Sequence, residues 1–387
     1  MDLLTLKQDY LRKSGALHTA KEIEGQPELW ECTAEGFYNA TKEIETFLQT
    51  AYAEADSIIL TGAGTSAFIG LSLQGIFFRK TKIITRAIAT TDIVSHPQDY
   101  FSKEQTPLII SFARSGNSPE SCAALELADK FSKKCLHLII TCDEDGALAK
   151  LNLLNPSCVF VLPEKANDKS LAMTGSYSAM LLTGLLIANL NDKNFCDQQI
   201  MYLTAAAKKI FDQYLPVLQQ VAEKGFKRAV FLGSGALSGT ATEASLKLQE
   251  LTDGQIICKA DTYLGLRHGP KAVIDENTLV VYFFSNNKYV QRYEQDLVNT
   301  MKDGNNAMFS LSVSEQPTTT DDIDAQINFG EAQRQINEDF LPVCSILVGQ
   351  LLGFYKSLQL GLMPDAPSVN GAISRVVKGV NIYPVEF

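Results

Sequence analysis

The feature that most constrains the fold is a repeat in the pattern of predicted strands. In the first half of the chain, short runs of β-branched and apolar residues alternate with helix-length segments, which is typical of βαβ units. The predicted strands are Ser57–Thr61, Lys82–Ala89, Pro107–Ser111, Leu136–Thr141 and Cys158–Leu162, followed in the second half by Arg228–Gly233, Ile256–Lys259, Thr278–Phe283, Ala307–Ser312 and Ala325–Phe329. A shift of 171 residues superposes four of the five pairs and places Gly62 and Gly64 on Gly233 and Gly235. The sequence therefore predicts an α/β protein with two tandem doubly wound parallel sheets and helices on both faces.

The repeat sets the expected domain boundaries. A helical segment at 1–40 precedes a first domain at 41–195 and a second at 196–363, and an irregular tail occupies 364–387. The link between the domains is expected in the polar stretch Asn191–Asp197. A chain of 387 residues is long enough to bury a large core in each domain without disulfides or metal.

Charge and cysteine usage exclude several classes of function. The 34 basic and 44 acidic residues give a formal charge of −10, which argues against a nucleic-acid partner. The eight cysteines contain no Cys-x-x-Cys or zinc-like pattern, so we expect reduced thiols and no metal. The N-terminal stretch lacks a signal-peptide pattern, and the apolar stretches Ser178–Leu190 and Leu341–Tyr355 are shorter than a membrane span. We therefore expect a cytoplasmic protein with buried apolar helices and no membrane contact.

Two loops of the first copy are candidates for binding a phosphate group. Both follow predicted strands, at the sheet edge where doubly wound folds bind ligands. Pro119 suits the first position of a helix and Ser118 its N-cap, so the loop before them would lie at the positive helix end. The alternative is that both loops are ordinary capped turns, and Ala67 in place of a third glycine argues against a dinucleotide motif. The candidate ligands are Thr65, Ser66, Arg114, Ser115, Asn117 and Ser118.

The second copy differs at the matching position. It has 284–287 (Phe-Ser-Asn-Asn) and lacks the serine-rich pattern and the proline. We predict that only the first copy holds phosphate.

The second copy instead carries charged groups with catalytic potential. Glu243, Lys247 and Glu250 are spaced to lie on one helix face, and Thr240 with Glu243 matches a capping box that would mark the helix start. The alternative for these charges is an ion pair on a solvated face. His268 precedes Gly-Pro, which predicts a loop position, although an exposed histidine without function fits the same pattern. His137 lies in an apolar strand pattern and is interpreted as structural.

Taken together, these motifs resemble the sugar isomerase (SIS) domains of the isomerase half of glucosamine-6-phosphate synthase. They resemble still more closely the bacterial family of tagatose-6-phosphate ketose/aldose isomerases and galactosamine-6-phosphate deaminases. The resemblance covers residues 40–387. It rests on 64–66 (Gly-Thr-Ser), 114–118 (Arg-Ser-Gly-Asn-Ser), Glu243–Glu250, 267–271 (Arg-His-Gly-Pro-Lys) and Arg375–Val380.

The resemblance implies a role for particular residues. Ser66, Ser115 and Ser118 fall on phosphate-binding positions, while Arg114 replaces a glutamine of the synthase and Ala113 a loop serine. It further implies that Glu250 is the base, that His268 opens the sugar ring, and that Lys378 is the tail lysine, with Glu243 and Lys247 supporting Glu250. The chain departs from the synthase in four places, one of which is the absence of the Gly-Glu that precedes Leu-Lys-His in the synthase. The Glu250-to-His268 interval is two residues longer, the tail lacks Pro-Arg-Asn-Leu, and the glutaminase domain is missing.

The family resemblance implies an enzyme without a cofactor that acts on a small sugar phosphate. The expected reaction converts galactosamine 6-phosphate and water into tagatose 6-phosphate and ammonia. Two alternatives remain: plain aldose–ketose isomerisation of a neutral hexose phosphate, and a non-catalytic sugar-phosphate sensor. The resemblance also implies a homodimer or higher even homo-oligomer with its active site near the subunit interface.

Overall fold

The computed structural model describes residues 2–301, 304, 306–318, 320, 322–377 and 379–385. Its contacts divide the chain into two compact units, each built around one five-stranded sheet. The first-sheet unit contains Leu29–Asp168, Gly175–Lys193 and Ile373–Phe387. The second-sheet unit contains Met1–Glu28, Lys169–Thr174 and Asn194–Ala372. Each unit thus draws on segments that are far apart in the sequence.

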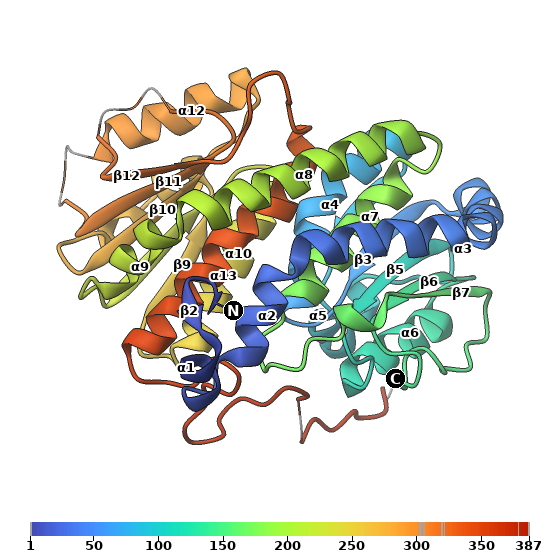
Figure 1. The fold of residues 1–387 in the computed structure, drawn as a ribbon. Coiled ribbons are helices and arrows are strands. Elements are labelled where there is room, and N and C mark those ends of the chain that lie inside the picture. Colours follow the sequence, from blue (N-terminus) through green and yellow to red (C-terminus); the bar gives the residue numbers. More distant parts are fainter. Residues whose placement is uncertain are drawn as a thin grey trace. The chain divides into compact units, whose positions relative to one another are not determined.

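The first-sheet unit is a parallel sheet with the strand order β4-β3-β5-β6-β7 (Figure 1). Alternate residues of its strands, such as Ile59, Ile109 and Ile139, pack against α5 and α6, while α4 and α7 contact the sheet and each other. The strands are β3 (Ser57–Thr61), β4 (Ile84–Ala87), β5 (Pro107–Ala113), β6 (Leu136–Thr141) and β7 (Ser157–Val161). The helices are α3 (Gln26–Glu54), α4 (Thr65–Thr81), α5 (Thr90–Ser95), α6 (Pro119–Phe131) and α7 (Gly175–Ala188), with 3-10 turns η1 (Pro97–Asp99) and η2 (Glu164–Ala166).

The second-sheet unit repeats this topology, with the parallel order β9-β8-β10-β11-β12. The helices α9, α10 and α13 pack together, and α11 and α12 contribute to an apolar cluster with β8 and β10. The strands are β8 (Arg228–Leu232), β9 (Ile257–Asp261), β10 (Thr278–Phe283), β11 (Phe309–Ser314) and β12 (Ala325–Asn328). The helices are α8 (Lys193–Gln213), α9 (Leu215–Glu223), α10 (Leu237–Leu251), α11 (Tyr263–Leu266), α12 (Lys288–Asn299) and α13 (Leu341–Gln359), with η3 (Pro270–Val273) and η5 (Glu338–Phe340).

The two sheets confirm the predicted repeat. The strands β3 and β8 begin 171 residues apart, as do β5 and β10. Both sheets have the order 2-1-3-4-5 of flavodoxin-like folds, in which the chain direction across the sheet reverses between the first and third strands. These central strands are buried on both faces, which explains their continuous apolar sequences.

The first residues of the chain pack within the second-sheet unit. A hairpin of β1 (Asp2–Leu3) and β2 (Leu6–Lys7) precedes α1 (Gln8–Lys13) and α2 (Leu17–Glu24). The Tyr355 hydroxyl of α13 donates to the Leu4 carbonyl at 2.9 Å, and Gln26 donates to the Gln350 side chain at 2.6 Å. The segment is therefore fixed to α13 by polar contacts.

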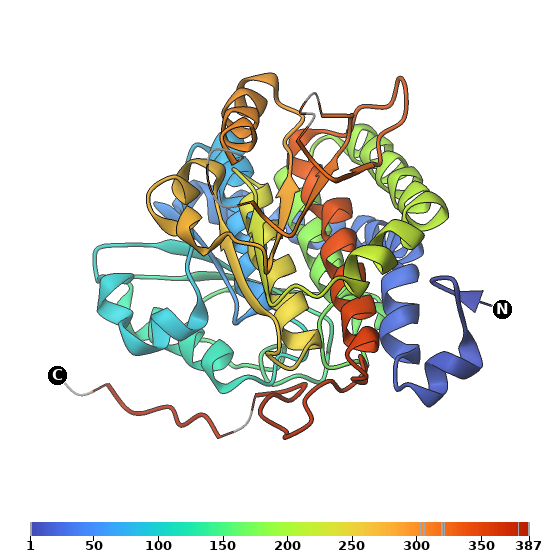
Figure 2. The ribbon, with the colours of Figure 1, turned by 90° about the vertical axis from the view of Figure 1, so that its left-hand side faces the viewer.

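The helix α13 is the central buried helix of the second-sheet unit. By length and composition alone, Glu338–Gln359 would suit a membrane span, but 94% of its apolar window is buried inside the protein. Its burial agrees with the expectation from the sequence that Leu341–Tyr355 forms a core helix. The described residues after Met363 form no helix or strand, and Figure 2 shows them as an irregular red chain.

Candidate active site

The two candidate phosphate loops lie beside each other on the first sheet. One follows β3 and opens α4, and the other follows β5 and opens α6. Because β3 and β5 are paired in parallel, their carboxyl ends meet at the same edge, where the topology reverses. The sequence predicted that both loops lie at this edge, and the pairing of β3 with β5 shows that they are neighbours.

The first loop brings Thr65 and Ser66 to the first turn of α4. Gly64 precedes this turn with φ +54°, in the left-handed region that favours glycine. A Cβ on Gly62 would lie 2.6 Å from the Ser66 Cβ, so the chain can turn this tightly only without a side chain there. The free N–H groups of a helix start favour an anion.

The second loop places Ser115, Asn117 and Ser118 before α6. Ser118 is the N-cap residue and Pro119 the first helical residue, as predicted, and the structure shows no hydrogen bond from the Ser118 side chain to the helix start. The Asn117 side-chain Oδ1 accepts from the Ala147 N–H at 3.0 Å, which ties this loop to the segment after β6. Ser115 and Ser118 are half-buried. Both residues therefore lie in the loop that leads into the first turn of α6.

The Arg114 side chain contacts the C-terminal tail. Its side chain is buried, and one guanidinium nitrogen donates to the Arg375 carbonyl of the tail at 2.6 Å. Sequence reasoning could not give this direction. It also assigned no role to Arg375, which belongs to the tail segment Arg375–Val380 and was noted only as part of the family resemblance.

The matching loop of the second-sheet unit binds the protein's own carboxylates. The Ser285 hydroxyl and the Asn287 amide both donate to the Glu338 carboxylate, and the Asn286 amide donates to Glu315 at 2.8 Å. Burial raises the pKa of the nearby Glu294 to about 8, with a further contribution from Glu338, against a lowering by the Ser285 N–H. The Glu338 and Glu315 carboxylates accept the hydrogen bonds that this loop would otherwise donate to an external anion. This supports the expectation that only the first copy binds phosphate.

The helix α10 carries the three charged candidates of the second-sheet unit. Lys247 lies between two carboxylates, with its Nζ 2.6 Å from Glu250 Oε2 and 3.4 Å from Glu243 Oε1. The side chains of Glu243 and Lys247 are 0% and 1% exposed, whereas that of Glu250 is 23% exposed. The ion pair is therefore buried rather than on the solvated face considered from the sequence. Lys247 therefore holds one oxygen of the partly exposed Glu250 carboxylate in place.

The start of α10 corrects one prediction. The capping-box interpretation of Thr240 and Glu243 is wrong, because α10 begins at Leu237 and both residues are buried inside the helix. The turn that starts the helix is set by Gly235, with φ +56°, and by the Leu237 N–H, which donates to the Ser234 carbonyl at 3.1 Å. A glycine turn thus starts the helix one turn earlier than the side-chain pattern indicated.

His268 lies on a turn between α11 and η3. Its backbone N–H donates to the Gly265 carbonyl at 3.0 Å, and Gly269 after it has φ +111°. The imidazole is exposed, in agreement with the predicted loop position. Lys378, the predicted tail lysine, lies outside the described residues.

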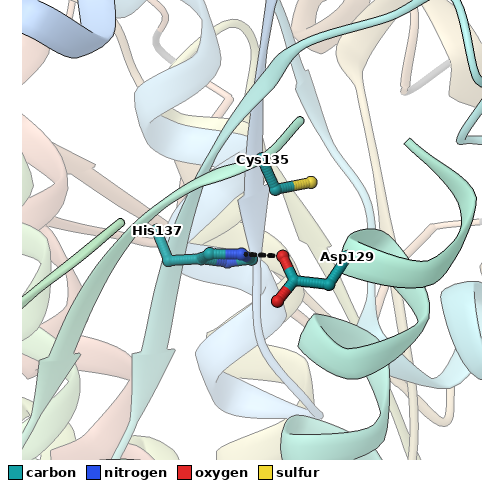
Figure 3. A group of neighbouring side chains, drawn as sticks. All are labelled: Asp129, Cys135 and His137. Atoms are coloured by element: carbon teal, nitrogen blue, oxygen red, sulfur yellow. Dashed lines mark hydrogen bonds and ion pairs between the residues drawn. The ribbon is translucent and has the colours of Figure 1, made fainter. Parts of the chain in front are cut away.

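Within the described part of the chain, one group of side chains has ligand atoms close enough for a metal ion. Asp129, Cys135 and His137 have these atoms within 4.8 Å of one another (Figure 3). His137 Nε2 lies 2.7 Å from Asp129 Oδ1, while Asn155 and the Leu154 N–H each donate to the same carboxylate at 2.8 Å. Burial raises the pKa of the Cys135 thiol to about 12, so it is not the thiolate that metals prefer. The group lies at the amino end of β6, away from the phosphate loops, and is best explained as a structural hydrogen-bond network.

We expect Asp129→Asn to destabilise the protein by about 2–4 kcal/mol at neutral pH. Burial raises the Asp129 pKa, but the hydrogen bonds from His137, Asn155 and Leu154 outweigh it and hold the pKa below its ordinary value. The contribution of the carboxylate is therefore present above the unfolded-state pKa and is lost as the pH falls through the lower folded-state pKa. Urea unfolding at several pH values measures the difference, which should shrink below about pH 4.

The control for this prediction is Asp145→Asn. Asp145 pairs with Lys150 on the surface, where its side chain is 79% exposed, so we expect the urea unfolding curve of this variant to match that of the wild type. A pH-independent loss in the Asp129 variant would contradict the assignment.

Comparison with known proteins supports the fold and the family. The SIS domain profile matches residues 51–190. The chain is 39% identical to a D-galactosamine-6-phosphate deaminase of Shewanella sp. (strain ANA-3), over 98% of this chain and 95% of that protein. A solved structure from Clostridium novyi NT covers all of both chains with a TM-score of 0.95 and 41% identity. The tagatose-6-phosphate ketose/aldose isomerase structure from Escherichia coli has a TM-score of 0.83 and 32% identity, over 95% of this chain and 97% of that one.

Proposed function

This chain belongs to the SIS domain family, and we propose that it is a sugar-phosphate enzyme that converts galactosamine 6-phosphate and water into tagatose 6-phosphate and ammonia. The observation that carries the proposal is the full-length similarity to a galactosamine-6-phosphate deaminase in a chain that also has a carboxylate, Glu250, anchored by a buried lysine. A sensor without chemistry would not need such an arrangement, which uses two buried charges to hold a third group at the surface.

The phosphate group is proposed to bind at the reversal point of the first sheet. Ser115 and Ser118 supply hydroxyl donors, and Thr65 and Ser66 stand at the start of α4 beside them. Binding the phosphate end of the sugar gives orientation energy to the reaction at the far end of the molecule.

Glu250 is proposed as the base that moves a proton between C2 and C1. The open-chain amino sugar loses its C2 proton to the carboxylate and forms an enol-type intermediate. Return of this proton at C1 leaves an imine at C2. A salt bridge from Lys247, with Nζ 2.6 Å from Glu250 Oε2, holds the Glu250 carboxylate in one orientation, as a general base requires.

His268 is proposed to open the sugar ring, and water completes the reaction. The exposed imidazole has ring nitrogens that can donate or accept a proton at the ring oxygen of the sugar. Water then adds to the C2 imine, the C–N bond breaks, and ammonia leaves with both hydrogens of the water, whose oxygen becomes the ketone oxygen. The ketone product is tagatose 6-phosphate, and Lys378 is proposed to stabilise the oxyanion that forms at the carbonyl.

The test is incubation of the purified chain with galactosamine 6-phosphate and with glucosamine 6-phosphate. We expect equal amounts of ammonia and ketose 6-phosphate from the galacto substrate, at a kcat/KM at least about tenfold above that for the gluco substrate. Release of ammonia from neither sugar would reject the proposal.

A second candidate is plain aldose–ketose isomerisation, because the Escherichia coli relative bears the name tagatose-6-phosphate ketose/aldose isomerase. This reaction would interconvert tagatose 6-phosphate and galactose 6-phosphate without loss of nitrogen. Turnover of the neutral sugar, with no ammonia from the amino sugar, would favour it.

A further inference from the structure

The C-terminal tail is attached to the phosphate loop of the first-sheet unit by an arginine. Arg114 follows the last residue of β5 and is 6% exposed. Its Nη2 donates to the backbone carbonyl of Arg375 at 2.6 Å, a contact between residues 261 positions apart. Both residues belong to the first-sheet unit. The residue that begins the loop thus contacts the tail directly.

The side chain of Arg375 is held in turn by the segment after β7. Its Nε and Nη2 donate to the Asp168 carbonyl at 2.9 and 2.6 Å, and Nη2 also donates to Asn167 Oδ1 at 2.6 Å. A guanidinium group suits such a fork because its donors are planar and fixed in direction. Arg375 is therefore held at both its carbonyl and its side chain.

The anchor for Arg375 is itself rigid. The Asp168 carboxylate accepts from the Gly175 and Ser176 N–H groups at 3.1 and 2.9 Å, and from the Ser176 hydroxyl at 2.6 Å. These contacts cap the N-terminus of α7, and Asp168 is 1% exposed. The tail is thus fixed between two elements at the carboxyl edge of the sheet, namely the loop after β5 and the cap of α7.

We propose that Arg114 and Arg375 form a latch through which the phosphate loop positions the C-terminal tail. Arg114 is then a positioning residue for the tail and not a ligand of the phosphate. A phosphate that orders the loop also orders Arg114, and through it the backbone of Arg375.

The consequence for catalysis rests on the proposed function. Arg375 precedes Lys378 by three residues, and three residues of chain span at most about 11 Å. The latch therefore fixes the chain three residues before the proposed catalytic lysine. Loss of the latch would misplace a catalytic group while leaving the phosphate site intact, and such a misplacement lowers kcat rather than substrate affinity.

Hydrogen–deuterium exchange tests the latch without reference to catalysis. In the full chain with Arg114→Gln, we expect backbone amides of residues 373–377 to exchange at least about threefold faster than in the wild type. Inorganic phosphate should slow this exchange in the wild type and not in the variant. The matched control is Arg292→Gln, which changes an exposed arginine of α12 and should leave the tail unaffected. Unchanged tail exchange in Arg114→Gln would overturn the proposal.

Kinetics provide the second test. Arg375 lies on the irregular tail outside the sheet, so we expect Arg375→Gln to fold. We expect Arg114→Gln and Arg375→Gln each to lower kcat about tenfold, with inhibition by inorganic phosphate unchanged within about twofold. Because the two residues act as one unit, the double variant should be no slower than the slower single variant.

The outcomes separate the latch from the proposed function. Multiplicative losses in the double variant, or a tenfold weaker phosphate inhibition in Arg114→Gln, would overturn the latch and make Arg114 a phosphate ligand. If the wild type releases no ammonia, the proposed function fails, and the exchange experiment still decides whether the latch exists.

Discussion

Replacing Glu250 with glutamine is expected to lower kcat about 10²- to 10⁴-fold, the range that a general base contributes. Glutamine keeps the size of the side chain and removes only its ability to accept the C2 proton. Exchange of the C2 proton with solvent deuterium, followed by NMR, should disappear together with ammonia release. Binding of an unreactive hexitol 6-phosphate should change less than about threefold, because the phosphate loops belong to other elements.

The control for this prediction is Glu223→Gln at the exposed end of α9 in the same unit. This variant removes one carboxylate without touching α10, and its turnover should match the wild type. Turnover of Glu250→Gln within tenfold of the wild type would remove Glu250 from the role of base.

The second large effect is expected on stability, from Lys247→Met. This change leaves the Glu243 carboxylate, 0% exposed, without the ammonium group that lies 3.4 Å from it. Removing one partner of a buried ion pair costs about 3–5 kcal/mol, since the remaining charge loses an attraction that offset its burial. Urea unfolding measures the loss, which should exceed that of most single substitutions.

A double variant gives the decisive comparison for Lys247. With Glu243→Gln added to Lys247→Met, no full charge remains at the buried site, so we expect the double variant to be more stable than Lys247→Met alone. An additive loss, with the double variant least stable, would show that the two charges do not interact.

The fold was predictable because its central strands are buried on both faces. Such strands appear in the sequence as continuous apolar runs. The starts of β3 and β8 differ by the repeat of 171 residues, as do those of β5 and β10, and the starts of β6 and β11 agree with it to within two residues. Strand pairing follows from the same repeat, because both copies must use one topology. The loops at the carboxyl ends of β3 and β5 could therefore be located before any coordinates were known.

The burial of the ion pair on α10 could not be predicted, because it depends on a helix about one hundred residues later in the chain. A Cβ on Gly349 of α13 would lie 2.5 Å from the Ala244 Cβ, and one on Gly353 would lie 3.1 Å from the Lys247 carbonyl. These glycines let the two helices approach closely and exclude water from the charges. Helical spacing gives the face on which Glu243 and Lys247 lie, but not what covers that face.

The contact of Arg114 with the tail was missed for a related reason. Its sequence position, next to Ser115 in a phosphate-type loop, favours a role in binding an anion. The direction of its side chain is set by Arg375, which is 261 residues away and has no periodic signal. Irregular segments carry no pattern from which such long-range contacts can be read.

The contacts between the first residues of the chain and α13 have a consequence for synthesis on the ribosome. Leu4 and Gln26 are made before their partners Tyr355 and Gln350, which follow them 351 and 324 residues later in the chain. At about 5–20 residues per second, translation separates the two by roughly 15–65 seconds. During this interval the nascent second-sheet unit lacks its apolar central helix, and its unfinished core is a surface that chaperones recognise.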